Sequence, residues 1–180
     1  MTNSSSGDGV WAAVRAKRAV REFADRPLDD EHLERILDAG RRSGSSKNLQ
    51  RWDFIVCVDR AHLRELAAVG PWAGHLAGAA AGIALVTPDP KAADSPLSVL
   101  FDLGQAAENM MLVAWELAIG SVPATVYEHD LARQLLGYPA DRHCEYLLSF
   151  GYPADAGVFT APRKAGARRR LDEVVHRERW

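Results

Sequence analysis

The longest regular pattern of apolar positions runs through residues 98–117. Apolar residues recur there every three or four positions, first at Leu100, Leu103, Ala107, Met110, Ala114 and Leu117, and in a second stripe at Val99, Ala106 and Val113. This spacing predicts one helix that is apolar around most of its circumference. We expect it to be either the central core helix or half of a subunit interface.

Shorter patterns predict the other elements. Helices are expected at 10–16, from Asp29 or Asp30 to about Arg42, at 61–68 and at 130–136, and strands at 54–58, 83–87, 121–123 and 145–150. Helices and strands mix without a regular βαβ alternation, which favours the α+β class. We expect one domain at 10–180, preceded by a polar, disordered leader at 1–9.

The segment 66–88 has no formally charged residue and is long enough to cross a bilayer. Pro71, Trp72 and His75 interrupt it, and much of the remainder is Ala and Gly. The segment is therefore predicted to be a short helix followed by a buried strand, and no membrane association is expected.

Composition narrows the classes of function. The chain has 180 residues, with 22 Lys and Arg against 24 Asp and Glu, and this net charge of −2 argues against a nucleic-acid-binding protein. Cys57 and Cys144 both lie in apolar runs, so we expect buried, reduced thiols and a cytoplasmic protein.

Several common motifs are absent from the sequence. It contains no Gly-x-Gly-x-x-Gly fingerprint, no Walker-type phosphate loop and no Gly-x-Ser-x-Gly elbow. The six histidines never fall at metal-ligand spacing, so no metal site is expected. If the protein is an enzyme, a cofactor brings the reactivity.

Three polar clusters could bind such a cofactor. The basic segment (17–23) contains Lys17, Arg18 and Arg21, and converging cations of this kind bind phosphate. The polar loop (43–54) carries Ser45, Asn48 and Gln50, which can donate to and accept from a planar heterocycle. The basic tail (163–180) includes Arg163, Lys164, Arg168, Arg169 and Arg170. Taken singly, each also fits a plainer interpretation: a solvated basic turn, a polar turn and a flexible tail.

Together, and in this order, the motifs resemble the nitroreductase family of flavin-dependent oxidoreductases. The similarity covers about residues 10–180. It rests on the basic segment, a Pro-x₅-Leu-x₂-Ile-Leu-x-Ala helix at 27–39, a Ser-x₂-Asn-x-Gln-x-Trp-x-Phe loop at 45–54, an Asp-Leu-Gly-x-Ala-x₂-Asn helix at 102–109, and the stretches 136–139, 150–153 and 171–176.

The resemblance implies a nitroreductase-like α+β fold, with a central, mostly antiparallel sheet flanked by helices, and an intertwined homodimer with FMN at the subunit interface. It implies an enzyme that passes hydride from NADH or NADPH to a nitroaromatic, quinone or flavin acceptor by ping-pong turnover. Flavin atom N5 would carry the chemistry, so no catalytic side chain is expected. The implied FMN contacts are Lys17, Arg18, Arg21, Ser45, Asn48, Gln50, Val122, Pro123, Ala124, Thr125, Arg168 and Arg169, some of them from the partner chain.

The chain departs from the family pattern in places. Lys17 stands where Arg is usual, Ala19 replaces a Ser, and Gly44 and Arg51 occupy positions where Pro is common. These changes keep open a flavin-holding protein without turnover. Two further alternatives are an enzyme that cleaves reduced flavin and a nucleic-acid binder that uses the basic tail.

Overall fold

A computed structural model describes residues 8–162 and 168–180. Its centre is a four-stranded antiparallel sheet in the order β1-β2-β4-β3, built from β1 (Asp53–Cys57), β2 (Ala81–Pro88), β3 (Gly120–Thr125) and β4 (Arg142–Gly151). The two middle strands are mostly buried, because helices cover both faces at the centre of the sheet. The predicted antiparallel sheet with flanking helices is confirmed.

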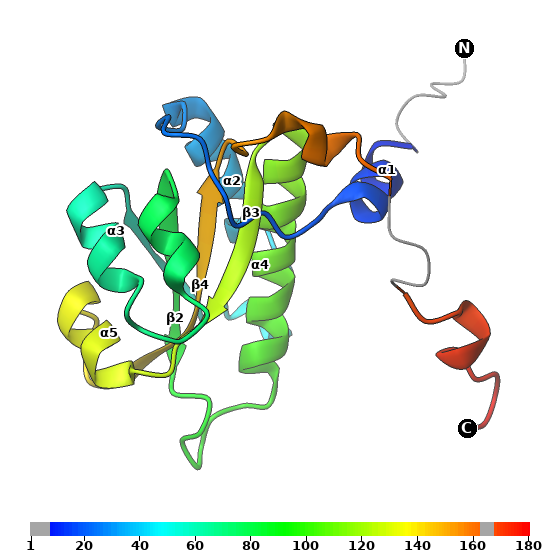
Figure 1. The fold of residues 1–180 in the computed structure, drawn as a ribbon. Coiled ribbons are helices and arrows are strands. Elements are labelled where there is room, and N and C mark those ends of the chain that lie inside the picture. Colours follow the sequence, from blue (N-terminus) through cyan, green and yellow to red (C-terminus); the bar gives the residue numbers. More distant parts are fainter. Residues whose placement is uncertain (1–7, 163–167) are drawn as a thin grey trace.

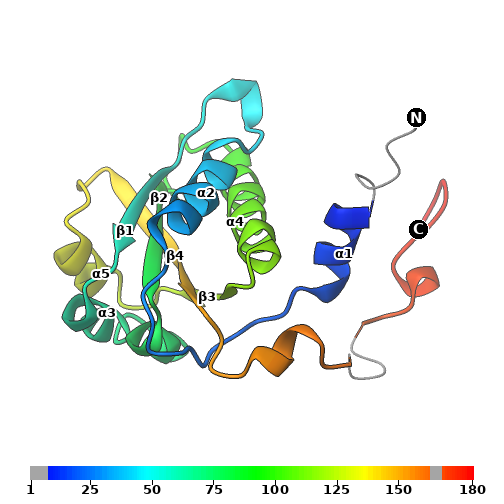
Figure 2. The ribbon, with the colours of Figure 1, turned by 90° about the horizontal axis from the view of Figure 1, so that it is seen from above.

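Helices lie on both faces of this sheet (Figures 1 and 2). One face packs against α2 (Asp30–Arg41) and α4 (Ser98–Glu116), where Ile36, Leu103 and Met110 meet Ile83 and Phe150. The other face is covered by α3 (Arg60–Leu66), the 3₁₀ helix η2 (Gly74–Gly78) and α5 (His129–Leu136). The core is therefore divided into two apolar clusters by a single sheet.

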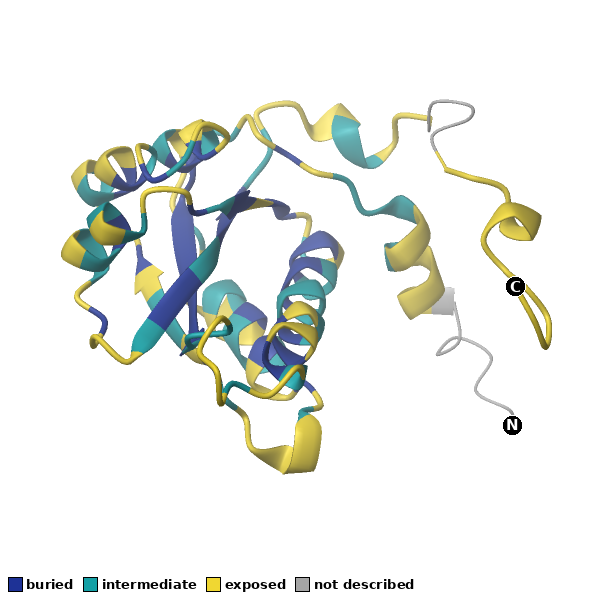
Figure 3. Ribbon diagram, turned by 90° about the horizontal axis from the view of Figure 1, so that it is seen from below, coloured by how far each residue is buried: buried dark blue, intermediate teal, exposed yellow. Residues whose placement is uncertain are grey.

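The two ends of the described chain lie outside this body. Helix α1 (Asp8–Ala16) and residues 168–180, which contain the 3₁₀ helix η4 (Leu171–Glu173), are mostly exposed (Figure 3). A further 3₁₀ helix, η3 (Ala156–Phe159), runs from the end of β4 toward α1 (Figure 1). Exposed apolar side chains are concentrated here, including Val10, Trp11, Leu171 and Trp180.

The predicted helices and strands are all present, with small shifts of their ends. Helix α1 begins at Asp8, inside the segment predicted as a disordered leader, and residues 1–7 of that segment lie outside the described residues. β4 begins three residues before the predicted start at 145, and β3 extends to Thr125. Both extensions carry polar residues that the apolar pattern does not capture.

The remaining structural expectations concern the thiols and the membrane. Cys57 and Cys144 are free and buried, and burial raises the pKa of the Cys144 thiol to about 12. Within 8–162 and 168–180, the helices are too short or too polar to cross a bilayer.

Candidate functional site

The basic segment lies along the outer edge of β3. Ala19 forms a parallel bridge with Ser121, and the Val20 N–H donates to the Ser121 carbonyl at 3.1 Å. The Lys17 ammonium lies 3.4 Å from the Glu108 carboxylate on α4. The segment therefore connects the edge strand of the sheet to the middle of the long helix.

Arg18 has an unusual environment for a guanidinium. Its Nη2 donates to the Ala161 carbonyl, but its Nε is buried and has no hydrogen-bond partner. It lines a cavity of about 370 Å³ with Arg15, Ala12 and Ala16. Buried donors are normally paired, so this N–H is available to an acceptor such as a phosphate oxygen.

Arg21 is exposed and lies close to His75 of η2. Burial, followed by the positive charge of Arg21, holds the pKa of His75 below its usual value. Atom Nδ1 of His75 is 2.7 Å from the hydroxyl of buried Ser149, which pairs with Val122 across β4 and β3. A positive charge is thus placed beside the strand predicted to line the flavin.

Along the edge strand β3, the side chains of residues 122–125 alternate between the two faces of the sheet. Val122 and Ala124 are buried, whereas Pro123 is exposed on the face toward α4. Pro123 contributes to a cavity of about 330 Å³, whose other walls are Leu85, Leu100, Leu103, Gly104, Ala107, Met111, Tyr146 and Leu148. This is an apolar slot between α4 and the face of the sheet formed by β2, β4 and β3, and small-molecule sites are lined mostly by apolar side chains of this kind.

The polar loop is held in place by its own side chains and by α4. Ser45 Oγ accepts from the Gln50 N–H at 3.0 Å, and the Gln50 amide donates to Asn48 Oδ1 at 3.1 Å. Asp102 of α4, which is buried, accepts from the Ser46 N–H at 3.0 Å. Left-handed backbone angles occur at Lys47, Asn48 and Gln50 (φ 53°, 55° and 46°), a strained conformation that often marks binding loops.

The polar loop and the Pro123 cavity lie on opposite sides of α4. Helical residues are spaced about 100° apart. Asp102 and Gln105 face the loop, whereas Leu103, Gly104 and Ala107 face the cavity. Ser45, Asn48 and Gln50 therefore do not converge with the residues 122–125 within one chain.

The basic tail is also separate from the basic segment in one chain. Residues 168–180 lie beyond α1, away from the sheet (Figures 1 and 2). Arg169 forms an ion pair with Glu173 of the same segment at 3.8 Å. Arg163 and Lys164 lie outside the described residues.

Three contacts of the site were not predicted from the sequence. They are Asp102 under the polar loop, Glu108 beside Lys17, and His75 beside Arg21. Only Asp102 carried a signal, because an acidic residue in the apolar pattern of 98–117 requires a partner if it is buried.

Comparisons with known proteins agree on one family. The family model described as "Nitroreductase family" matches residues 14–76 and 70–152. A curated protein of Archaeoglobus fulgidus, whose name proposes an NADH dehydrogenase or NAD(P)H nitroreductase, is 35% identical over 172 residues, covering 93% of this chain and 96% of its own. The NADPH-flavin oxidoreductase of Vibrio harveyi is 26% identical over 78% of this chain and 64% of its own.

A solved structure matches the fold across nearly the whole chain. The FMN-dependent nitroreductase of Clostridium difficile superposes with a TM-score of 0.82 at 23% identity, covering 94% of this chain and 99% of that one. At this identity the likeness concerns the fold.

Proposed function

This chain belongs to the nitroreductase family and is an oxidoreductase, and we propose that it uses FMN to pass hydride from NADH or NADPH to a small acceptor. The observation that carries the proposal is the position of the basic segment, which lies against the edge strand that borders an apolar slot. This arrangement puts cations for a phosphate next to a surface for a planar ring.

The described residues fit the phosphate of FMN. Arg18 offers a buried, unpartnered Nε–H, and Arg15 lines the same cavity. Phosphate oxygens are strong acceptors, and an arginine donates to them in a charge-assisted, directional way. We assign phosphate binding to Arg18 and Lys17, with Arg168 and Arg169 completing the set. Arg21 is assigned a charge-assisted hydrogen bond to the electron-rich side of the flavin ring.

The described residues also fit the isoalloxazine ring. The backbone of Val122, Pro123, Ala124 and Thr125 lies at the edge of the sheet, and Pro123 opens onto the apolar slot. Pro at an edge strand loses no ladder hydrogen bond, so the sheet tolerates it at this position. We assign one face of the ring to this stretch.

Bound FMN supplies the hydride chemistry, by ping-pong turnover between donor and acceptor. The chain's own residues bind and orient, and no side chain has to transfer a proton. Arg21, whose charge already lowers the pKa of neighbouring His75, places positive charge beside residues 122–125. A cation at that position stabilises the more negative, reduced cofactor.

The geometry supports a site shared between two chains. Ser45, Asn48 and Gln50 lie on the opposite side of α4 from the Pro123 cavity, so a second copy has to supply them. Leu100 and Phe101 of α4 and Trp11 of α1 are large apolar side chains left exposed in one chain. We propose a homodimer in which these surfaces meet and the basic tail reaches the partner's cofactor.

The acceptor is proposed as a class. The Pro123 slot is apolar and suits flat aromatic molecules such as nitroaromatics, quinones and flavins. The similarity to a Vibrio harveyi protein named as an NADPH-flavin oxidoreductase is in keeping with a flavin acceptor.

The decisive experiment follows the visible spectrum of the FMN-loaded protein under anaerobic conditions. We expect NADH or NADPH to bleach the flavin absorbance, and a nitroaromatic, quinone or free flavin to restore it without forming a ternary complex. Flavin that binds but is bleached by neither nicotinamide would favour the flavin-holding alternative. If the protein does not bind FMN, the proposed function is wrong.

A matched pair of variants tests the assigned cations. Arg21→Ala removes a charge beside residues 122–125, whereas Arg64→Ala removes an exposed charge on α3. We expect Arg21→Ala to weaken FMN binding by about ten- to a hundredfold, the value of one charge-assisted hydrogen bond of roughly 1.5–3 kcal/mol. Arg64→Ala should bind FMN as the parent chain does, and equal affinities in the two variants would reject the assignment.

A further inference from the structure

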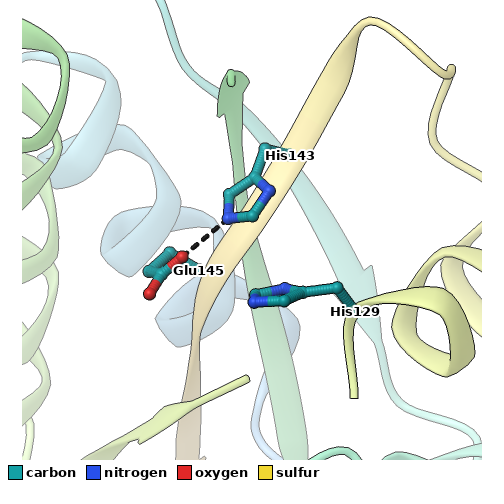
Figure 4. Close-up of side chains that lie close together, drawn as sticks. All are labelled: His129, His143 and Glu145. Atoms are coloured by element: carbon teal, nitrogen blue, oxygen red, sulfur yellow. Dashed lines mark hydrogen bonds and ion pairs between the residues drawn. The ribbon is translucent and has the colours of Figure 1, made fainter. Parts of the chain in front are cut away.

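Three side chains that can bind a metal ion, none of them assigned to FMN, meet where α5 begins beside β4. His143 Nε2 lies 2.6 Å from Glu145 Oε2, and the rings of His129 and His143 have centroids 4.6 Å apart. One ligand atom from each of the three residues lies within 4.8 Å of the other two. Figure 4 shows the three side chains directed toward a common space.

Local structure explains why these side chains meet. His143 pairs with Thr87, Cys144 with Val86 and Tyr146 with Leu85, so Glu145 is the extra residue of a β-bulge in β4. A bulge re-aims the side chains beside it and is frequent at functional positions. His129 is the first residue of α5, and its carbonyl accepts from the Tyr138 hydroxyl at 3.3 Å.

One nitrogen atom of this group has no hydrogen-bond partner within the described part of the chain. His143 is buried, and His129 Nδ1 is a buried nitrogen with no hydrogen-bond partner among the described residues. Buried polar nitrogens without partners are rare, and ion binding is one recognised reason for them. The ammonium of Lys91 is 4.0 Å from Glu145, and the Lys91 side chain is exposed enough to move away.

We propose that His129, His143 and Glu145 bind a divalent transition-metal ion of the zinc class. Two imidazole nitrogens and one carboxylate oxygen are ligands that Zn²⁺ accepts, with water in the fourth position. Zinc bonds of about 2.0–2.2 Å put neighbouring ligand atoms roughly 3–4 Å apart, so small side-chain rotations suffice to close the site. The Cys144 thiol is not part of this group, because it is packed in the apolar cluster under α3 and α5.

This site is independent of the proposed flavin chemistry. None of its three residues belongs to the basic segment, the polar loop, the residues 122–125 or the basic tail. The spacing of the histidines along the chain gave no sign of it, because His143 follows His129 by 14 positions and only folding brings them together.

The test is a calorimetric titration of Zn²⁺ alone into the purified, chelator-treated protein, with metal content measured after dialysis. We expect one Zn²⁺ per chain in the parent protein and in His62→Ala, which removes a histidine from α3 outside the cluster. His129→Ala and Glu145→Gln should weaken binding by more than about tenfold, because each removes one of three ligands. Circular dichroism confirms that each variant is folded.

A second readout is thermal stability. A metal that binds only the folded chain raises the Tm, so Zn²⁺ should raise it in the parent and in His62→Ala but not in His129→Ala. Two results would overturn the site: the parent chain takes up no Zn²⁺, or His129→Ala and Glu145→Gln bind it as tightly as His62→Ala does. The cluster would then be a hydrogen-bonded His–Glu pair beside a second, tilted histidine ring.

Discussion

Asp102 shows how one buried carboxylate on α4 can position a binding loop. It is 4% exposed and accepts the Ser46 N–H at 3.0 Å. Asp102→Ala leaves that N–H without its charged acceptor, so we expect a loss of roughly 1.5–3 kcal/mol in the free energy of unfolding. Urea denaturation measures this loss, and FMN titration should show weaker binding because the polar loop is no longer held.

Two further variants make the prediction specific. Asp102→Asn keeps an oxygen acceptor and should recover most of the lost stability, whereas Asp141→Ala, at an exposed position, should change little. If Asp102→Ala has the same free energy of unfolding and the same FMN affinity as the parent chain, the loop is fixed by its internal hydrogen bonds alone.

The hydrogen bonds within the polar loop could not be predicted from the sequence, although the residues that form them could. The residues of the polar loop were identified from the sequence because Ser45, Asn48 and Gln50 cluster between a predicted helix and a predicted strand. Their mutual hydrogen bonds and left-handed backbone angles were not predictable, because they depend on where α4 places Asp102. The residue types predict that a loop is present, but tertiary contacts decide its conformation.

Gly120, at the start of β3, controls how closely the basic segment approaches the sheet. A Cβ at this position would lie 2.6 Å from Val20 Cβ and Cγ1, and a β-branched side chain has little freedom to move aside. We expect Gly120→Ala to push 17–21 away from β3, costing about 1–3 kcal/mol of stability as overpacking does. FMN affinity, measured by fluorescence quenching, should fall with it.

Two further variants test the prediction for Gly120→Ala, one as a control and one that should reverse its effect. A Cβ at Gly78 would meet nothing within 4 Å, so Gly78→Ala should bind FMN normally. Adding Val20→Gly to Gly120→Ala should restore binding, because it removes all three colliding atoms, the Cβ of Val20 included. Unchanged affinity in Gly120→Ala would mean that contact with β3 does not position the cations.

At the scale of elements, the apolar pattern located the α-helices and strands of the described residues but not the 3₁₀ helices or the pairing of the strands. The 98–117 pattern predicts α4 because a 19-residue helix gives many repeats of one period. The sheet order β1-β2-β4-β3 places β3, the last strand but one in the chain, at an edge. Nothing in the local periodicity of β3 encodes that position, although the edge is what lets the basic segment form its bridge with Ser121.

At the scale of the whole molecule, a single chain leaves several large apolar side chains exposed to solvent. Leu100 and Phe101 on α4, Val10 and Trp11 on α1, and Trp180 in the tail are all exposed. The sequence anticipated this for α4, because a helix that is apolar around most of its circumference cannot be covered by one sheet face. It could not show that the polar loop and the Pro123 cavity lie on opposite sides of that helix, which is the geometric reason for a shared site.

The proposed dimer can be tested at Phe101, which is 71% exposed on α4. A charge placed in an apolar interface loses its hydration without gaining a partner, so Phe101→Asp should shift the assembly from twice the 19.7 kDa chain mass toward the monomer. Sedimentation velocity measures the shift. FMN should be lost in parallel, because the partner supplies Ser45, Asn48 and Gln50.

The matched control is Val58→Asp, at an exposed apolar position just after β1 and outside the proposed interface. It should remain dimeric and keep its flavin, which separates a specific interface from a general effect of added charge. A parent chain that sediments as a 19.7 kDa monomer with a full complement of FMN would contradict the shared site. The polar loop would then have no access to the cofactor, since its side of α4 faces away from the Pro123 cavity within each chain.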